Sequence, residues 1–251
     1  MPPVTILATL AAGILGTSFL SGIFGMAGGM LLMGLLLAVM PLAAAMTLHG
    51  ITQMASNGWR AILWRAHVRW PIAAWFAAGS IAAAGAFAAI ATPPTKAVAL
   101  LILGLTPFIG LALPARLRLN VARPVHGVIC GAVCMTLQMI AGVSGPILDV
   151  FFVQSGLDRR GIVATKAAVQ ALGHALKLTY FASLLVSVGD ELSPWLAAMA
   201  IVLAIFGTQG SRHVLERMND TQFRQWSRRL IFALSVVYLG EGAWLVANAS
   251  P

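Results

Sequence analysis

Long apolar runs recur along the whole chain, separated by short polar stretches. Each run has roughly 17–25 residues, which is the length that an α-helix needs to cross the hydrocarbon core of a bilayer. Single crossings are predicted at 43–64, 71–91, 96–113, 162–186, 192–208 and 229–247. Two longer apolar runs, 4–40 and 123–155, are each interrupted by glycine. The pattern therefore predicts an all-α polytopic integral membrane protein with about 8–10 membrane helices.

The two glycine breaks occupy matching places in the two halves of the chain. The first is Gly22-Ile-Phe-Gly25-Met-Ala-Gly28-Gly29, and the second is Ala141-Gly142-Val-Ser144-Gly145-Pro146. Non-helical backbone at membrane depth persists only where it is buried in protein or lines a cavity, because lipid offers it no hydrogen-bond partner. Paired breaks of this kind point to the binding site of a transporter.

Composition excludes a soluble domain. Of the 251 residues, 59% are hydrophobic and only 9% are charged, and the mean hydropathy is +0.89. The formal net charge is +9, but the basic residues lie in short loops, so the expected partner is the lipid bilayer rather than nucleic acid. No positively charged segment precedes 4–21, which is expected to be a retained membrane segment. Cys130 and Cys134 lie one helical turn apart, where a disulfide has poor geometry, and are expected to be packing residues.

Loop charge predicts the orientation of the chain in the membrane. An acidic loop at 187–194 contrasts with four basic connections that are expected to be cytoplasmic. These connections are 60–71, the junction 114–123, 155–166 and 209–229.

This orientation requires the chain to reverse within its broken segments. The run 123–155 starts and ends on the same side, so its break must turn the chain back as a hairpin, and the same is inferred for 4–40 by analogy. Residues 1–116 and 117–251 are therefore predicted to be inverted repeats that form one transport domain. If each broken run crossed the membrane once instead, the five arginines of 209–229 would lie outside.

A polar stripe follows each break. Each stripe holds an amide, then Asn or His, then a cation, at spacing i, i+4 and i+7, which places its members on one helix face. The stripes are Gln53, Asn57 and Arg60 in the first half and Gln170, His174 and Lys177 in the second. Lys177 falls near the centre of its span, where insertion of a lysine costs on the order of 3 kcal/mol, so it marks a substrate or ion pathway. The alternatives are snorkelling or a structural ion pair. Arg60 lies near the end of its span, where a role in topology is expected.

The breaks themselves favour binding of an anion. A helix that restarts after a break exposes unpaired N–H groups at the positive end of its dipole. Proline is tolerated there because its missing N–H would be unpaired in any case. The expected substrate-binding residues are Gly25, Gly28, Gly29, Ser144, Gly145 and Pro146 at the breaks and Gln53, Asn57, Gln170, His174 and Lys177 on the stripes. Close helix packing is the alternative for the glycines.

Three titratable residues are candidates for proton coupling. His174 carries an imidazole, which titrates near neutral pH, although a hydrogen bond between helices is the alternative. Asp149 lies one turn beyond the second break and could pair with Lys177 or His174 or shuttle a proton. His49 lies in the middle of its span. The methionines of the first half raise the alternative of copper, but adaptable packing is expected. No metal site and no cofactor are predicted.

Short glycine motifs extend over nearly the whole chain. They are Gly16-x5-Gly22-x2-Gly25-Met-Ala-Gly28-Gly29 in the first half, and Gly131, Gly142-Val-Ser-Gly145-Pro146-Ile147, Gln154-x-Gly156-Leu157 and Ala164-Thr165 in the second. In these motifs the chain resembles the sulfite exporter TauE/SafE family. Two departures stand out: Met30 follows the first break with no proline before Pro41, and Ala141 stands where the first half has Gly25.

The resemblance implies a carrier in the bacterial inner membrane that exports a small sulfur-containing anion, such as sulfite, sulfoacetate or another organosulfonate. With the residues above, it predicts a secondary transporter, rather than an enzyme, that binds its anion at the midplane between the two breaks. The alternatives are an anion channel, a carrier of another small organic anion or of a cation, and an intramembrane enzyme using Ser144, His174 and Asp149. A homodimer is compatible with these features.

Overall fold

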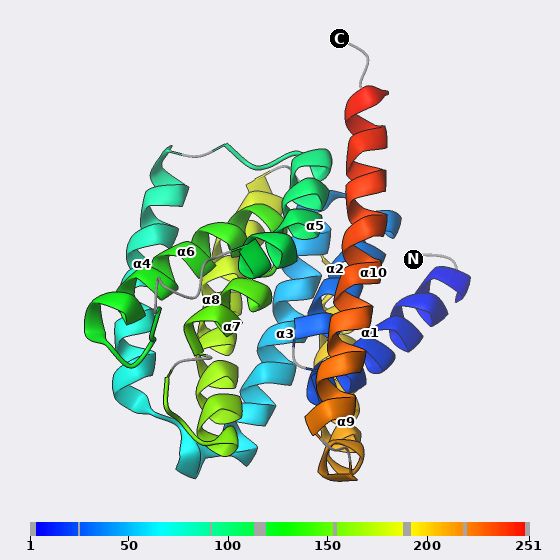
Figure 1. Cartoon of the computed structure of the whole chain (residues 1–251). Coiled ribbons are helices and arrows are strands. Elements are labelled where there is room, and N and C mark those ends of the chain that lie inside the picture. Colours follow the sequence, from blue (N-terminus) through cyan, green and yellow to red (C-terminus); the bar gives the residue numbers. More distant parts are fainter. Residues whose placement is uncertain are drawn as a thin grey trace.

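The computed structural model is a bundle of helices (Figure 1). It describes residues 4–248 apart from 25, 91, 113–118, 153–154, 188–191 and 218–219. The helices are α1 (Val4–Phe24), α2 (Met26–Val39), α3 (Leu42–Leu63), η1 (Arg65–His67), α4 (Trp70–Ile90), α5 (Lys96–Ala112), α6 (Pro124–Ala141), α7 (Gly145–Phe152), α8 (Arg159–Ser187), α9 (Pro194–Arg217) and α10 (Asp220–Ala247). The predicted all-α class is therefore confirmed.

Within the described ranges, six helices are long and apolar enough to cross a membrane: α1, α4, α6, α8, α9 and α10. The other helices include the two that follow the breaks. With 14 residues α2 is about 21 Å long, and with 8 residues α7 is about 12 Å long. A hydrocarbon core is about 30 Å thick, so neither α2 nor α7 spans it alone.

The predicted basic connections are more helical than expected. The 3-10 helix η1 lies within 60–71, and α8 begins at Arg159, inside 155–166. The connection 209–229 is almost entirely helical, because α9 continues to Arg217 and α10 begins at Asp220. Hydropathy marks only the part of a helix that suits hydrocarbon, whereas a helix can continue into polar surroundings with its own backbone hydrogen bonds intact.

The chain reverses at the second break. Gly142 ends α6 in the left-handed conformation, with φ of 81°, and its N–H donates to the carbonyl of Gln138. Near the end of α7, the Phe151 carbonyl accepts a hydrogen bond of 3.0 Å from the N–H of Val121, which lies just before α6. The end of α7 is thereby held beside the start of α6, so α6 and α7 form a hairpin.

Four helix pairs hold the bundle together, and each pair joins the first five helices to the last five. The pairs are α1 with α9, α3 with α8, α4 with α6, and α5 with α10. Small residues allow the closest approaches: a Cβ at Gly131 of α6 would run into the backbone of Phe76 in α4, and one at Gly79 of α4 would run into the backbone of Val128 in α6. This is the usual manner of helix packing in membranes.

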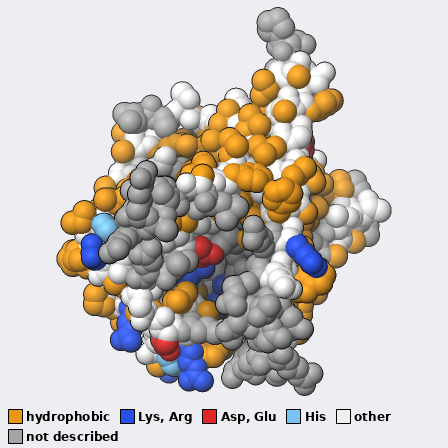
Figure 2. All heavy atoms as spheres, viewed as in Figure 1, with side chains coloured by type: hydrophobic (Ala, Val, Ile, Leu, Met, Phe, Trp, Pro, Cys, Tyr) orange, Lys and Arg blue, Asp and Glu red, His pale blue; other side chains and the backbone are white. Residues whose placement is uncertain are grey.

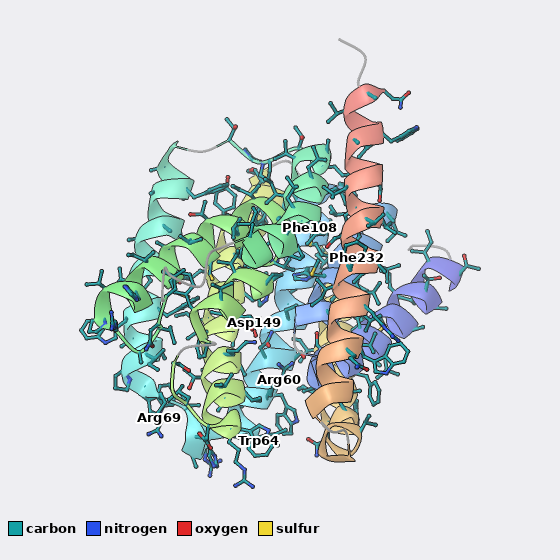
Figure 3. All side chains as sticks on the ribbon, in the orientation of Figure 1. Arg60, Trp64, Arg69, Phe108, Asp149 and Phe232 are labelled. Carbon is teal, nitrogen blue, oxygen red and sulfur yellow. The ribbon has the colours of Figure 1, made fainter. Side chains whose placement is uncertain are left out.

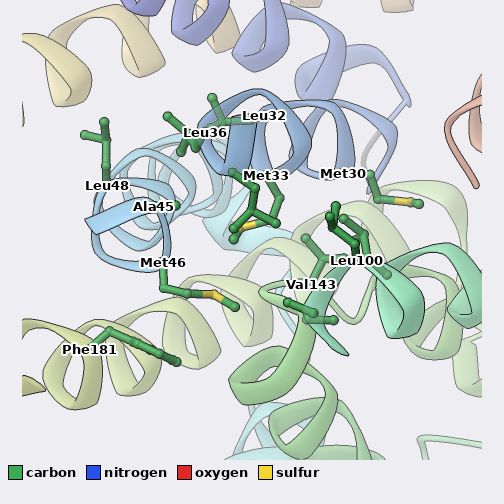
Figure 4. Close-up of a cluster of buried hydrophobic side chains, with 14 of the residues drawn as sticks. Met30, Leu32, Met33, Leu36, Ala45, Met46, Leu48, Leu100, Val143 and Phe181 are labelled. Carbon is green, nitrogen blue, oxygen red and sulfur yellow. The ribbon is translucent and has the colours of Figure 1, made fainter. Parts of the chain in front are cut away.

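The main hydrophobic core surrounds the second break (Figure 4). Buried side chains of α2, α3, α5 and α8 meet there beside Val143. Met30, Met33 and Met46 are fully buried in this core, as the expectation of adaptable packing requires. A second cluster holds Cys130 and Cys134, both buried and unbridged, with sulfur atoms 4.0 Å apart.

The outer surface is strongly apolar, and its basic side chains are concentrated away from one end. Figure 2 shows hydrophobic side chains over the upper part of this face and Lys and Arg in its middle and lower parts. The loop after α3 and the start of α8 share the lower end, because Arg69 N–H donates to Thr165 Oγ1 at 3.0 Å and Arg160 lies over the ring of Trp64. Two of the predicted basic connections therefore lie together.

Candidate functional site

A small cavity lies between the two glycine breaks. Both halves of the chain line it: Gly29, Gln53, Val143, Ser144, Gly145, Gln170 and His174. About 10 Å³ is open to the centre of a water-sized sphere, which is room for about one water molecule. Except for Val143, every lining residue is one of the predicted substrate-binding residues.

Gln53 of α3 forms the wall contributed by the first half. Its side chain is buried, and its Oε1 accepts a hydrogen bond of 3.3 Å from Asn57 Nδ2. Its Nε2 is buried and has no hydrogen-bond partner among the described residues. Gly29 lets this amide lie against α2, because a Cβ there would come within 3.3 Å of Gln53 Oε1. The first half thus brings an unpaired N–H donor to the cavity.

Gln138 of α6 was missed by the sequence analysis. It is 2% exposed, and its Oε1 accepts a hydrogen bond of 3.3 Å from Ser144 Oγ at the cavity wall. Its Nε2 is buried without a partner in the described part of the chain. The available signal was an amide one turn before the break in an apolar run, where only a buried or paired amide is tolerated.

The start of α7 offers fewer backbone donors than the sequence suggests. The N–H groups of Ile147 and Leu148 both donate to the Ser144 carbonyl, at 3.1 and 3.0 Å, and Pro146 has no N–H. Gly145 therefore carries the N–H of this first turn that is left for a ligand. Pro146 is buried in the first turn and does not line the cavity.

Behind the cavity, a chain of hydrogen bonds connects the two breaks. Gly29 carbonyl lies 2.9 Å from His49 Nε2, and His49 Nδ1 lies 2.9 Å from Lys177 Nζ. Lys177 Nζ also donates to the Gly142 carbonyl at 3.2 Å. A carbonyl only accepts, so His49 carries its proton on Nε2 and accepts from Lys177 on Nδ1. In this tautomer His49 is neutral and links Lys177 to the first break.

Lys177 is completely buried, with an exposed fraction of 0%. Full burial excludes snorkelling of the lysine towards the head groups. A structural ion pair is not found either, because no carboxylate of the described residues pairs with Lys177. His174 lies one turn before it, with its ring centroid 5.3 Å from that of His49 and its Nδ1 without a partner among the described residues. The Lys177 amine, with no carboxylate partner among the described residues, therefore lies one helical turn from His174 in the cavity wall.

Asp149 has a different partner from those expected. Its carboxylate pairs with Lys166 of α8, and both side chains are partly exposed. The prediction that Asp149 pairs with Lys177 or His174 is therefore wrong. Lys166 lies one turn before Gln170 on α8 and binds the Asp149 carboxylate instead. The apolar sequence around Asp149 does not indicate this neighbour.

The remaining predicted residues have separate roles in the structure. Gly28 does not line the cavity: a Cβ there would overlap the backbone and hydroxyl of Ser21 in α1, so the packing reading applies to it. Asn57 is buried and also donates to the Gln53 carbonyl, at 2.9 Å. Gly25 lies outside the described residues. Arg60 is buried rather than projecting into a loop, and its Nη2 donates to the Ser21 carbonyl at 2.8 Å.

The three residues of the hydrolase alternative do not form a relay. Ser144 Oγ donates to Gln138, while the Asp149 carboxylate is held by Lys166. A nucleophile needs its base within hydrogen-bond reach and an orienting group behind that base, and this arrangement provides neither link.

A bundle with six helices that are long and apolar enough to cross a membrane, in the part of the chain that the structure describes, is the architecture of a polytopic membrane protein. The family model described as Sulfite exporter TauE/SafE matches residues 9–238, and the chain belongs to this family. It is therefore a membrane transporter for sulfite or a related anion. No curated protein and no solved structure matches the chain with significant similarity.

Proposed function

We propose that this chain is a secondary transporter that binds sulfite or an organosulfonate in the cavity between the two breaks and exports it across the bacterial inner membrane. One observation carries the proposal: unpaired buried N–H donors and a cation without a described carboxylate partner converge there from both halves of the chain. A site of donors and positive charge is complementary to an oxyanion.

Each wall of the cavity would contribute a different donor. Gln53 Nε2 would donate from the first half, and Ser144 Oγ and the Gly145 N–H would donate from the second. Gln138 Nε2, which lies behind Ser144, would support the same face. Lys177 would balance the charge of the anion from behind the wall, because a positive charge acts over several ångströms in surroundings of low dielectric.

Two inverted repeats, 1–116 and 117–251, would supply the two walls. The helix pairs support this division, since α1 packs on α9 as α6 packs on α4, and α3 with α8 and α5 with α10 pair corresponding helices. The basic connections would face the cytoplasm. An interior-negative potential then drives an anion outwards with about 2.3 kcal/mol per charge per 100 mV, so export needs no coupled ion.

The size of the cavity favours a carrier over a channel. Room for about one water molecule is too little for a sulfur oxyanion, so the two breaks must separate to admit one and close again behind it. The short α7 and the left-handed Gly142 before it are the elements that would move.

Counterflow in proteoliposomes tests the proposal. Vesicles loaded with unlabelled sulfite should accumulate ³⁵S-sulfite transiently, which a channel does not produce. Lys177→Gln should abolish this accumulation. Lys96→Gln is the matched control, because Lys96 is 36% exposed and pairs with Glu241 at 3.6 Å, and it should transport like wild type. Equal counterflow in wild type and Lys177→Gln, or none above protein-free vesicles for any sulfonate, would contradict the proposal.

A further inference from the structure

Arg60 is buried in a manner that a role in membrane topology does not explain. It lies in the last turn of α3, its side chain is 7% exposed, and its Nη2 is held by the Ser21 carbonyl. Its Nε is buried with no hydrogen-bond partner among the described residues. An arginine that only sets orientation extends its guanidinium towards the head groups, where water solvates it.

Two serine hydroxyls near Arg60 are also unpaired. Ser18 and Ser21 of α1 are fully buried, and neither Oγ has a partner in the described part of the chain. Hydroxyls in apolar helices usually bond to a carbonyl three or four residues back. Neighbouring hydroxyls of this chain do so, as Thr17 bonds to Gly13 and Ser211 to Thr208, both at 2.6 Å. Ser18 and Ser21 make no such bond to a backbone carbonyl of the described residues.

The unpaired hydroxyl of Ser21 is directed at the start of α2. A Cβ built on Gly28 would lie 2.5 Å from Ser21 Oγ, so this hydroxyl lies against the first turn of α2, at the positive end of that helix. Arg60 holds the carbonyl of the same serine. The guanidinium, the hydroxyl and the positive end of α2 therefore meet at one place.

This place is distinct from the central cavity. Arg60 lies seven residues beyond Gln53 on α3, which is about 10 Å along the helix, with Asn57 between them. Figure 3 labels Arg60, and its label lies in the middle of the view, below that of Asp149.

We propose a second anion subsite at Arg60, Ser21 and the first turn of α2, which takes the oxyanion head of a sulfite or sulfonate before or after the central cavity. The inference rests on the proposed transport function and adds a second binding site along the transport path. Guanidinium N–H groups, a hydroxyl and a helix N-terminus are the donors that bind small oxyanions most strongly in proteins.

Equilibrium binding of ³⁵S-sulfite to the purified full chain in nanodiscs tests this subsite. Lys177→Met should lose the central site but keep sulfite binding, and adding Arg60→Gln should abolish what remains. Arg60→Gln alone should keep the central site. Ser21→Ala, which removes a hydroxyl that holds no bond, should weaken the binding retained by Lys177→Met about tenfold, as loss of a hydrogen bond to an anion does.

The outcomes separate the two proposals. If Lys177→Met binds no sulfite while wild type and Arg60→Gln bind it equally, the second subsite does not exist and the transport proposal stands. If the binding kept by Lys177→Met is unchanged by both Arg60→Gln and Ser21→Ala, the subsite is assigned to the wrong residues. If wild type binds neither sulfite nor sulfoacetate, both proposals fail together.

Discussion

The hydrogen bond between His49 and Lys177 should couple the two halves of the chain energetically. The perturbation is a double-mutant cycle with His49→Leu, Lys177→Met and the two together. Both residues are fully buried, their nitrogen atoms are 2.9 Å apart, and 128 residues separate them in the chain. Each substitution replaces a polar side chain by an apolar one of similar size, so packing changes little.

The three variants should differ in stability in a characteristic way. His49→Leu removes a charge-assisted hydrogen bond worth about 1.5–3 kcal/mol and leaves the Gly29 carbonyl without this donor, so it should destabilise by about 3 kcal/mol. Lys177→Met leaves His49 Nδ1 unpaired but also removes a buried charge, and these effects offset each other to within about 1 kcal/mol. The double variant should resemble Lys177→Met, so the coupling should equal the effect of His49→Leu alone, about 3 kcal/mol.

Unfolding of the purified protein in mixed micelles, titrated with dodecyl sulfate and followed by circular dichroism, would measure the cycle. Lys96 and Glu241 provide the control, because this pair is 36% exposed on both sides and should couple by less than about 1 kcal/mol. If the effects of His49→Leu and Lys177→Met simply add, the hydrogen bond does not connect the two halves and the tautomer assigned to His49 is wrong.

Three further substitutions, two of them paired with a control glycine, test the packing of the helices by the same unfolding measurement. Gly142→Ala forces a side chain into φ of 81° and sets its Cβ 2.6 Å from a methionine sulfur of α2, so it should destabilise the protein by about 2–4 kcal/mol. Its control is Gly156→Ala, where φ is 70° and no atom lies within 4 Å of the added Cβ. This control should show the backbone strain alone, about 1 kcal/mol. Gly131→Ala should destabilise by about 3 kcal/mol because its Cβ would meet the backbone of α4, whereas Gly16→Ala, with nothing within 4 Å, should be neutral or slightly stabilising. Tyr238→Phe removes a 2.9 Å hydrogen bond to a carbonyl of α2, so it should lower the free energy of unfolding by about 1 kcal/mol and leave sulfite counterflow intact. An unchanged stability would mean that this bond contributes nothing.

The hydropathy pattern predicts most of the helices, because a span must be about 20 apolar residues long whatever surrounds it. Glycines that interrupt these apolar runs also predict the breaks. Lipid cannot hydrogen-bond to non-helical backbone, so such a break occurs only where protein or a cavity surrounds it. Hydropathy does not predict the end of α9 and the start of α10, because a polar segment can form a helix without being apolar. The stripe spacing predicts Gln53, Gln170 and His174 at the cavity, because all three follow from helical periodicity within one segment.

Partners across the bundle could not be predicted in the same way. His49 and Lys177 meet because α3 packs on α8, and Asp149 of α7 meets Lys166 at the start of α8. Both contacts depend on how distant helices rotate about their axes, and one residue of rotation turns a side chain by about 100°. Burial of Arg60 has the same origin: its position in the sequence gives its depth, but only packing decides whether it faces protein or head groups.

The two cations that end the stripes explain why the breaks would favour an anion over a cation. Arg60 donates to a carbonyl in the last turn of α1, and Lys177 donates to the carbonyl of Gly142 at the end of α6. Each therefore neutralises the negative end of the helix before a break. The positive ends of α2 and α7, just beyond the breaks, have no such partner among the contacts described above. In the proposed transporter, the positive helix ends at each break would therefore stay uncompensated, and an anion between α2 and α7 would meet donors from both sides.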